Sequence, residues 1–379
     1  MHSLEMSQMN QSGCTVALVT PSYPPRIGGV EAHVTQLARG LSELGCKVCV
    51  FTQVARDDPA GGSTSIEGEV EVRRFPDITR SAHFEVAPSL PRALWQARSR
   101  FDIVHAHNFH GAPALAAAVL TSGPFIFTPY YHGVGHTTMA KVAHVVYDPL
   151  AGVIFRRATS VICISQAEAN LLIENYPRAR SRVTVIPTGV DREAIEVAVP
   201  FLTDRAVVLV VGRLESYKQV DRVLRSVNHL PEDVQLVIIG DGPMRSDLER
   251  LALEEGGTNR IIFTGRVDSN VLRRWQRTAA VTVCMSRHES YGMVLAEAVA
   301  AGSAVVASDI AAHREVASNV GGRVTLVSPD LSAGDLATTI EIVRASQSDP
   351  SVGRGVPSWS EIAQQTLSIY HDSLRNSVR

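Results

Sequence analysis

Short apolar runs that alternate with helical patterns are the sequence feature that most restricts how this chain can fold. A β-branched run at residues 14–20 is followed by a Pro/Gly loop, and apolar residues then keep helical spacing from Val30 to Leu44. Strands that alternate with helices form parallel sheets through crossover connections, so we expect a doubly wound, Rossmann-like α/β fold. The expected strands lie at residues 14–20, 47–52, 102–105, 125–128, 160–164, 183–186, 206–211, 235–239, 261–264, 281–285 and 304–307.

The chain is too long for one such sheet. Its 379 residues suit two domains, and the strand–helix alternation restarts after a short segment at residues 197–204. We therefore expect a Rossmann-like domain at residues 1–196, a second one at 197–355, and a final helix within 356–379. Two such domains facing each other would form a cleft at the carboxyl ends of both sheets, where ligands of such sheets bind.

Composition excludes several classes of protein. With 36 basic and 38 acidic residues the formal net charge is −2, so we expect no nucleic-acid partner. No apolar run reaches about 18 residues, and the chain starts with a polar segment, so we expect a cytoplasmic protein without a membrane span. Five cysteines, an odd number, argue against a disulfide framework, and we interpret the C-x-x-C of Cys46 and Cys49 as buried thiols.

Two loops that follow predicted strands carry residues suited to a phosphorylated ligand. Gly28 and Gly29 open the first helix, where glycine lets backbone amides approach an anion, although an ordinary loop explains them equally well. Arg213 and Lys218 follow the strand at 206–211 and could hold a pyrophosphate. By their spacing alone they could equally be surface charges.

A third loop carries two carboxylates in an E-x7-E arrangement, at Glu289 and Glu297. Between them Gly292 opens an apolar helix, so helix amides and both carboxylates could face one ligand. By spacing alone, an ordinary solvated helix face is an equally good interpretation.

The E-x7-E arrangement resembles the signature of the retaining GT-B glycosyltransferases of family four. Other fragments typical of that family follow in the right order, and their joint order is specific where each fragment alone is weak. They are PRIGGVE, HAHN, TPYYHG, ISQAE, VIPTGVD, VGRLESYKQVD, IGDGP and FTGRV. The final helix, PSWSEIAQQ, is similar to the helix that returns to the N-terminal domain in that family. The resemblance covers essentially the whole chain after the first thirteen residues.

This sequence departs from the family pattern at two places. Thr188 stands where the family usually has Asn, which we expect to affect local packing only. The usual D-x-G-G-x-x-E reads DIAAHRE from Asp309 to Glu315 and lacks both glycines. Because that loop approaches the donor in the family, the departure leaves the donor sugar open.

The resemblance implies a retaining transferase that moves a hexose or N-acetylhexosamine to an acceptor hydroxyl. The donor is a nucleotide diphosphate sugar, with UDP favoured over GDP, and the acceptor is a small molecule, a glycan or a lipid-linked molecule. In this assignment Glu289 binds the donor sugar and Glu297 the ribose. The implied donor-binding residues are Gly28, Gly29, Arg213, Lys218, Arg266, Val267, Glu289, Tyr291, Gly292, Met293, Val294 and Glu297. The implied catalytic residues are His132, Glu289, Arg213 and Lys218.

On the acceptor side the resemblance points to Tyr23, Asn108 and His132. We expect no cofactor and no metal site, because the chain has no D-x-D to hold a divalent ion across a pyrophosphate. His105 and His107 alternate along a strand end, and we do not expect both to face one ion.

Alternatives stay open. A sugar-nucleotide epimerase and a non-catalytic nucleotide-binding relative both fit the same fold. A modest basic stretch around Trp95 could make a weak membrane-surface contact, although a solvated helix is the better interpretation. The sequence does not set the oligomeric state.

Overall fold

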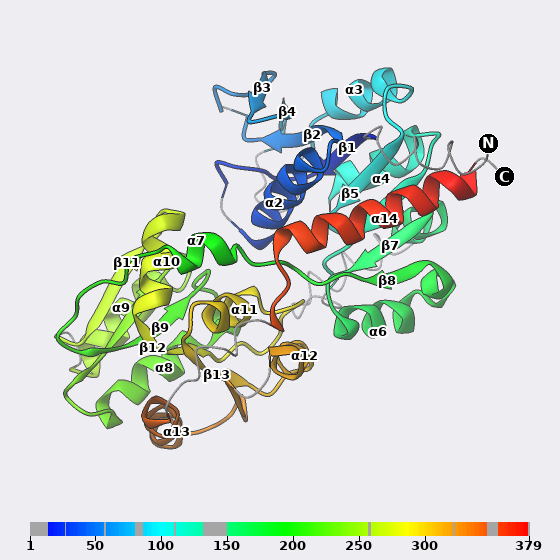
Figure 1. The fold of residues 1–379 in the computed structure, drawn as a ribbon. Helices are drawn as coiled ribbons and strands as arrows, with labels where there is room; N and C mark the ends of the chain where they lie inside the picture. The colour runs from blue at the N-terminus through cyan, green and yellow to red at the C-terminus, as the bar shows by residue number, and fades with distance from the viewer. Residues whose placement is uncertain are drawn as a thin grey trace. The chain divides into compact units, whose positions relative to one another are not determined.

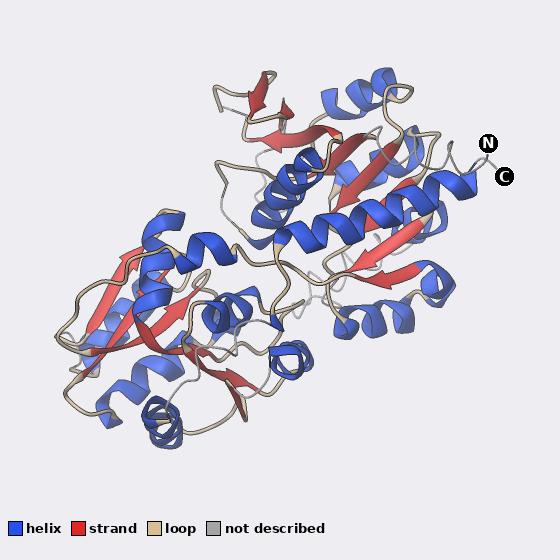
Figure 2. Ribbon diagram, viewed as in Figure 1, coloured by secondary structure: helices blue, strands red, loops and turns tan. Residues whose placement is uncertain are grey.

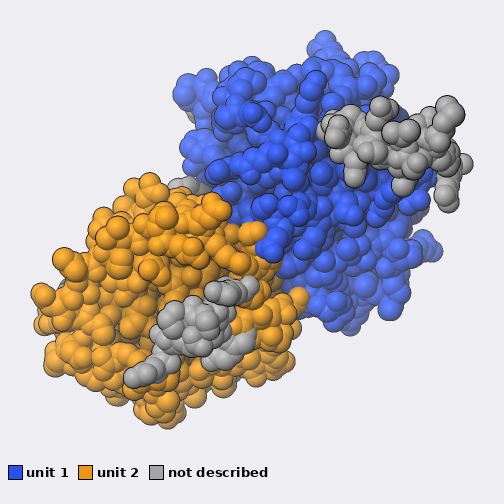
Figure 3. All heavy atoms as spheres, in the orientation of Figure 1, with its two compact units in different colours: residues 1–188, 359–379 blue, residues 189–358 orange. Residues whose placement is uncertain are grey.

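The computed structural model describes residues 14–26, 28–56, 58–79, 86–109, 111–131, 150–256, 259–320, 323–346 and 355–377. The chain divides into two compact units, which Figure 3 colours separately. Unit 1 comprises Met1–Thr188 and Trp359–Arg379, and unit 2 comprises Gly189–Ser358. The structural division thus falls at 188–189 and 358–359, whereas the sequence placed the boundaries at 196–197 and 355–356.

Unit 1 is built on an eight-stranded sheet in the order β3-β4-β2-β1-β5-β6-β7-β8 (Figure 1). All neighbouring strands are parallel except β3 and β4, which form an antiparallel pair. The strands are β1 (Thr15–Thr20), β2 (Lys47–Val54), β3 (Thr64–Glu67), β4 (Val70–Pro76), β5 (Ile103–His107), β6 (Phe125–Thr128), β7 (Ser160–Cys163) and β8 (Val183–Val185). Its helices include α2 (Gly29–Glu43), α3 (Ser89–Ala97), α4 (Ala112–Leu120), α6 (Gln166–Asn175) and α14 (Trp359–Ser377).

Helices cover both faces of this sheet (Figure 2). Neighbouring side chains of a strand point to opposite faces of the sheet, so alternate residues of β1 are buried in two different cores. Ala17 and Val19 join the cluster that includes Leu90 and Leu94 of α3, while Val16 is equally buried but outside that cluster. Burial on both faces explains why the strand is apolar throughout rather than alternating.

The C-terminal helix α14 is part of unit 1, as expected of a returning helix, and packs beside α2. Gly40 of α2 permits the close approach, since a Cβ there would lie 2.7 Å from Cβ of Ala363. Farther along α14, the Tyr370 hydroxyl lies 2.7 Å from Nδ1 of His105 on β5. The end of the chain is thereby joined to the centre of the first sheet.

Unit 2 contains a six-stranded, wholly parallel sheet in the order β11-β10-β9-β12-β13-β14. Its strands are β9 (Ala206–Val211), β10 (Val234–Ile239), β11 (Ile261–Gly265), β12 (Ala279–Cys284), β13 (Ala304–Ser308) and β14 (Val324–Val327). Its helices are α7 (Arg192–Glu196), α8 (Val220–Ser226), α9 (Arg245–Glu254), α10 (Ser269–Thr278), α11 (Met293–Ala300), α12 (Ala311–Val320) and α13 (Ala333–Ala345). The expected doubly wound architecture is present in both units.

Three strands were not predicted from the sequence. β3 is polar and almost wholly exposed, and β4 carries charged residues between its apolar ones, so neither has the buried pattern used to find strands. β14 is short and only half-buried along its length. These strands lie at or next to a sheet edge, where burial no longer selects an apolar run.

All five cysteines are free and buried, as interpreted from the sequence. The partner of Cys46 is not Cys49, however, because the Cys46 and Cys14 sulfurs lie 3.3 Å apart at the start of the β1–β2 pair. Among the described residues, no helix combines the length and apolar character that a membrane span requires. On α3 the exposed Trp95 ring is covered by the Arg98 guanidinium at 4.5 Å, and the membrane contact stays a prediction.

Three histidines are buried side by side in unit 1: His33 on α2, and His105 and His107 on β5. We expected His105 and His107 not to face one ion because they alternate along the strand end, but that reason is wrong, because residues two apart on a strand share a face. Their ring centroids lie 4.1 Å apart. They still form no ligand pair, because His105 also contacts Thr128 Oγ1 at 2.8 Å, so both of its ring nitrogens are hydrogen bonded.

Burial makes these imidazoles poor bases. Burial lowers the pKa of His33 to about 4, and burial together with His33 lowers that of His105 to about 3. Burial, with its two histidine neighbours, holds the pKa of His107 well below its usual value. In the folded protein the three rings are therefore neutral at a pH where an unfolded chain would protonate them.

We predict that the protein loses stability in mild acid. Below a pH of about 6.5 the unfolded histidines bind protons that the folded ones do not, so stability falls with pH by up to about 1.4 kcal/mol per pH unit for each histidine. Urea unfolding at pH 7.5, 6 and 5 measures this slope. His105→Gln should flatten it, and His229→Gln, at an exposed position of unit 2, should not. An equal slope in wild type and His105→Gln would contradict the prediction.

Candidate functional site

The strand order of unit 2 defines where its site can form. β10 lies on one side of β9 and β12 on the other, so the connections from β9 and β12 leave the sheet in opposite directions. Ligands of doubly wound sheets bind at the carboxyl ends of the strands beside such a reversal. The loops concerned are residues 212–219 after β9 and residues 285–292 after β12.

Glycines let the neighbouring loop from β10 support the β9 loop. Gly240 has φ +137°, and a Cβ at this position would lie 1.9 Å from the Gly212 carbonyl oxygen. A Cβ at Gly242 would lie 2.5 Å from the Leu214 carbonyl oxygen. Only glycine allows these backbones to come so close, which is the physical role of the IGDGP fragment.

An ion pair joins the two loops at the reversal. Lys218 Nζ contacts Glu289 Oε1, and the two side chains are only 16% and 17% exposed. Ser286 Oγ donates a hydrogen bond to the same carboxylate oxygen at 2.8 Å. The Arg287 amide donates to the Tyr217 carbonyl at 2.8 Å, so the backbones of the loops are also connected. The sequence motifs at the two loops therefore form one site.

Lys218 stays a cation in this half-enclosed position. Burial by itself lowers its pKa, but the Glu289 carboxylate, with Cys284 and Tyr217, outweighs burial and raises the pKa above its usual value. Its ammonium also lies 5.4 Å from the centroid of the Tyr217 ring. The site thus presents a fixed positive charge that is held by a carboxylate.

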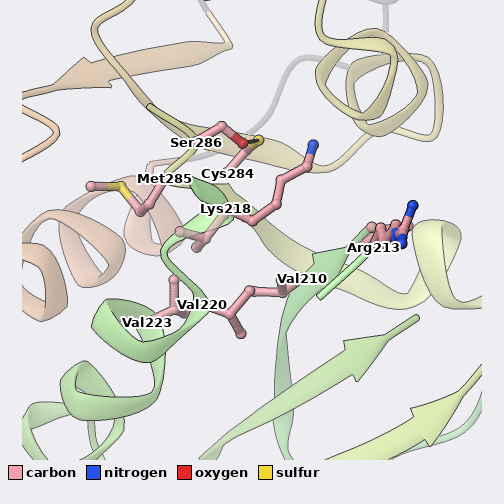
Figure 4. Close-up of a pocket in the computed structure, with 11 residues that line it drawn as sticks. Val210, Arg213, Lys218, Val220, Val223, Cys284, Met285 and Ser286 are labelled. Atoms are coloured by element: carbon pink, nitrogen blue, oxygen red, sulfur yellow. Dashed lines mark hydrogen bonds between the residues drawn. The ribbon is translucent and has the colours of Figure 1, made fainter. Parts of the chain in front are cut away.

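A pocket lies beside this pair, and Arg213, Lys218, Cys284 and Ser286 are among the residues that line it (Figure 4). In the view of Figure 4, Lys218 extends between the end of β12 and the apolar residues of β9 and α8. Arg213 is more open to solvent, with a side chain 69% exposed, and its Nε pairs with Glu215 at 3.0 Å. The two predicted cations are therefore both at the pocket, one half-enclosed and one exposed.

The helix α11 begins directly beside the ion pair. Gly292 precedes it with φ +103°, a left-handed conformation that disfavours other residues, and a Cβ there would lie 3.2 Å from the His313 ring. The Leu295 amide bonds to the Gly292 carbonyl at 3.0 Å, so Met293 and Val294 contribute the first helical amides. The start of a helix carries partial positive charge that suits an anion.

Glu297 lies farther along α11 and is half-buried. Gln276 of α10 donates a hydrogen bond to its carboxylate at 2.8 Å. Burial raises the Glu297 pKa, and the Gln276 bond and Arg273 act in the opposite direction. The carboxylate is positioned as a hydrogen-bond acceptor one turn from the helix start.

The remaining predicted donor residues of unit 2 differ in their surroundings. Tyr291 is buried, and burial raises its pKa to about 12. Arg266 and Val267 follow β11, two strands away from β9, and are not among the residues that line the pocket. Arg266 is exposed, whereas Val267 packs against the buried cluster that includes Leu209 and Val237.

Sequence reasoning missed a layer of side chains beneath Glu289. Cys284 Sγ lies 3.8 Å from Nε2 of His313, and Ser308 Oγ donates to the Ser286 carbonyl. His313 is completely buried and lies in the segment where this chain departs from D-x-G-G-x-x-E. His313 stands at an unspecified position of that pattern, followed by Arg314 and Glu315, so nothing in the sequence pointed to it.

The predicted residues of unit 1 that the structure describes follow β1 and β5, at the corresponding reversal. Gly28 caps α2, but Ser22 Oγ bonds to the Glu31 carboxylate, and a Cβ on Gly28 would lie 2.3 Å from that carboxylate. An acidic side chain therefore occupies the start of this helix. Gly29 is the first residue of α2.

The acceptor-side predictions fall after the same two strands. Tyr23 is buried after β1, and burial raises the pKa of its hydroxyl. Asn108 follows β5 with φ +76°, and its amide donates to the Thr128 carbonyl at 3.0 Å. His132 lies outside the described residues.

Comparisons with known proteins agree with this geometry. Residues 27–194 match the model of Glycosyltransferase Family 4, and residues 191–350 match that of Glycosyl transferases group 1. The chain is 30% identical to an alpha-maltose-1-phosphate synthase of Mycobacterium tuberculosis, over 94% of this chain and 98% of that protein. It is 26% identical to a D-inositol 3-phosphate glycosyltransferase of Xylanimonas cellulosilytica, over 90% of this chain and 91% of that protein.

Solved structures share the fold. A sucrose-phosphate synthase from Thermosynechococcus elongatus matches with a TM-score of 0.79 at 22% identity, covering 96% of this chain and 100% of that one. The Anabaena protein HepE, solved in complex with UDP and glucose, matches with a TM-score of 0.74 at 18% identity, covering 95% and 100%. From its two sheets, its paired loops and these relatives, the chain belongs to glycosyltransferase family four, has a GT-B fold and is a glycosyltransferase.

Proposed function

We propose that this glycosyltransferase moves a hexose or N-acetylhexosamine from a nucleotide diphosphate sugar to an acceptor hydroxyl, with retention of anomeric configuration and without a divalent metal. UDP is the favoured nucleotide. One observation carries the proposal: Lys218 and Glu289, from loops on either side of the strand reversal, form an ion pair beside a pocket that Lys218 lines, close to the start of α11. HepE, solved with UDP-glucose as well as with UDP, has the same fold and supports a nucleotide-sugar donor.

The leaving group is a nucleoside diphosphate, so the donor site must stabilise negative charge that grows as the glycosidic bond breaks. Lys218 and Arg213 supply cationic charge, and Met293 and Val294 supply the first amides of α11. Lys218 is the better placed of the cations, because its half-buried position makes its charge less screened by water than that of Arg213.

Glu289 is the group that we assign to the transferred sugar. Oε1 is bound by Lys218 and Ser286, whereas Oε2 has no hydrogen-bond partner among the described residues. A carboxylate oxygen that is held in place and still open to a ligand can accept hydrogen bonds from sugar hydroxyls. As positive charge develops on the sugar ring in an oxocarbenium-like transition state, the fixed carboxylate also favours it electrostatically.

Glu297 is assigned to the ribose, with its carboxylate oriented by Gln276. On unit 1 we keep Tyr23, Asn108 and His132 as acceptor-side residues. Glu289 is already paired with Lys218, so we do not assign it as a covalent nucleophile. Retention would instead follow if the acceptor attacks the sugar on the same face from which the diphosphate departs.

The first prediction concerns turnover. Glu289→Gln keeps the size of the side chain but removes its charge, so kcat should fall by about 100-fold or more because the lost interaction is strongest in the transition state. Glu249→Gln, a surface glutamate paired with Arg245, is the matched control and should keep wild-type kcat. Steady-state kinetics with the authentic acceptor measure both variants. Unchanged kcat in Glu289→Gln would refute the assignment.

The second prediction concerns nucleotide affinity. Glu297→Ala removes one charge-assisted acceptor, so binding of the nucleoside diphosphate should weaken by about 1.5–3 kcal/mol while kcat changes less. Because burial raises the Glu297 pKa, the wild-type affinity should decline with acidification earlier than an ordinary carboxyl would cause. Calorimetric titration of UDP from pH 8 to 5 tests both points. Identical affinity and pH profile in the variant would remove Glu297 from the site.

The third prediction concerns metal. Turnover should survive exhaustive EDTA treatment, because the positive charge at the diphosphate comes from Lys218, Arg213 and the α11 amides. Lys218→Ala should reduce kcat/KM by about 100-fold or more, and added Mg²⁺ should not restore it. Activity that vanishes in EDTA and returns with Mg²⁺ or Mn²⁺ would contradict the proposed mechanism.

A further inference from the structure

Glu289 of the Lys218–Glu289 pair lies close to two further side chains of types that bind metals, and the three come from different segments of unit 2. Cys284 ends β12, Glu289 lies in the following loop, and His313 lies on α12. One ligand atom from each, a thiol sulfur, a carboxylate oxygen and an imidazole nitrogen, lies within 4.8 Å of the other two. The cluster is enclosed rather than exposed, since Cys284 and His313 are both buried.

The spacing of the sulfur and nitrogen suits a zinc ion. Cys284 Sγ and His313 Nε2 are 3.8 Å apart. Two such ligands at about 2.3 Å and about 2.0–2.1 Å from a tetrahedral Zn²⁺ lie roughly 3.6 Å from each other. The Cys–His pair would therefore need to close by only a few tenths of an ångström, and the flexible Glu289 side chain could supply the third ligand.

The far side of the imidazole is fixed in the way that zinc-binding histidines usually are. His313 Nδ1 lies 2.8 Å from the Ser308 carbonyl oxygen, which can only accept a hydrogen bond, so Nδ1 carries a proton. That contact orients the ring and directs Nε2 toward Cys284. A backbone carbonyl or carboxylate behind the imidazole is the common outer contact of zinc ligands.

The contact between Cys284 and His313 makes the thiol easier to deprotonate. Burial opposes charge on either group, but their mutual contact outweighs it, lowering the pKa of Cys284 and raising that of His313. A metal ion would take the place of the shared proton between sulfur and nitrogen, and one proton would leave to solvent. The thiolate is a soft ligand and the imidazole also suits Zn²⁺, so the pair favours Zn²⁺ over Mg²⁺ and Ca²⁺.

Lys218 opposes the metal, because its ammonium holds the same Glu289 carboxylate that the ion would need. A divalent cation at Cys284 and His313 would repel the ammonium and compete with it for Glu289. A metal ion bound to Glu289 would therefore weaken its pairing with Lys218 and would occupy the oxygen that we assign to the donor sugar.

We propose that Cys284, Glu289 and His313 form an inhibitory Zn²⁺ site, which withdraws the Glu289 carboxylate from the donor sugar when it is filled. A water molecule completes the four-coordinate shell. This metal ion would not be one that the reaction requires, because its binding takes the Glu289 carboxylate away from the donor sugar. That inhibitory consequence rests on the proposed function, whereas metal binding itself does not.

The binding test uses the full chain, freed of metal with EDTA and titrated with Co²⁺ as a spectroscopic substitute for zinc. Wild type should show a thiolate-to-cobalt charge-transfer band with tetrahedral visible bands, both abolished by one equivalent of Zn²⁺. Cys284→Ser should lose the charge-transfer band, and His313→Gln should weaken Zn²⁺ binding by about 10–100-fold. Circular dichroism checks that each variant is folded, and the two variants test the site independently.

Cys46→Ser is the matched control, because Cys46 is a buried thiol that also lies close to another sulfur, that of Cys14. This variant should keep the cobalt spectrum of the wild type. A wild-type protein without a charge-transfer band would overturn the proposal. A band that disappears in Cys46→Ser but persists in Cys284→Ser would overturn it as well.

The inhibition test measures turnover with Zn²⁺ buffered at low free concentration. Wild-type turnover should fall at least tenfold at saturation and recover with EDTA, and His313→Gln should require about 10–100-fold more zinc. Stimulation by zinc, or binding without inhibition, would overturn the inhibitory assignment. If cobalt binds as expected but no sugar nucleotide is turned over under any condition, the proposed function fails and the metal site stands.

Discussion

The reversal of strand order beside β9 is the constraint on which the candidate site depends. Because β10 and β12 lie on opposite sides of β9, the connecting segments leave in opposite directions and do not cover the strand ends between them. The two loops can then face each other, and the Lys218–Glu289 pair joins them. Glycines at 240 and 242 permit the close backbone contacts that hold the first loop in place.

The charges of Lys218 and Glu289 depend on each other. A lone buried ammonium or carboxylate would be costly, so Lys218 and Glu289 stabilise each other in a region of reduced solvation. Ser286 adds a hydrogen bond, and Cys284 and His313 form the layer beneath. A diphosphate and a metal ion would both act on this pair, but in opposite senses. The anion would bind the lysine, while the metal ion would compete for the glutamate.

Many residues of the candidate site could be named from the sequence because each lies in a short motif directly after a predicted strand. Lys218 follows its strand directly, and Glu289, Gly292 and Glu297 lie on one strand–loop–helix segment. The sequence could not reveal that Glu215 pairs with Arg213 or that Glu31 bonds to Ser22 at the start of α2. A glutamate looks the same in a sequence whether its carboxylate is solvated or paired. Nor could it reveal His313, which reaches Cys284 only after β12 and β13 pair.

The sequence by itself determined the α/β class, the presence of two Rossmann-like sheets and most of their strands, because burial on both faces demands continuous apolar runs. The tertiary structure alone decided strands β3, β4 and β14, which lie at or next to a sheet edge and whose partial exposure leaves no such pattern. The tertiary structure alone also decided which residues lie next to each charged or metal-binding side chain. Those neighbours come from strands distant in sequence, and strand order and register, which periodicity does not encode, bring them together.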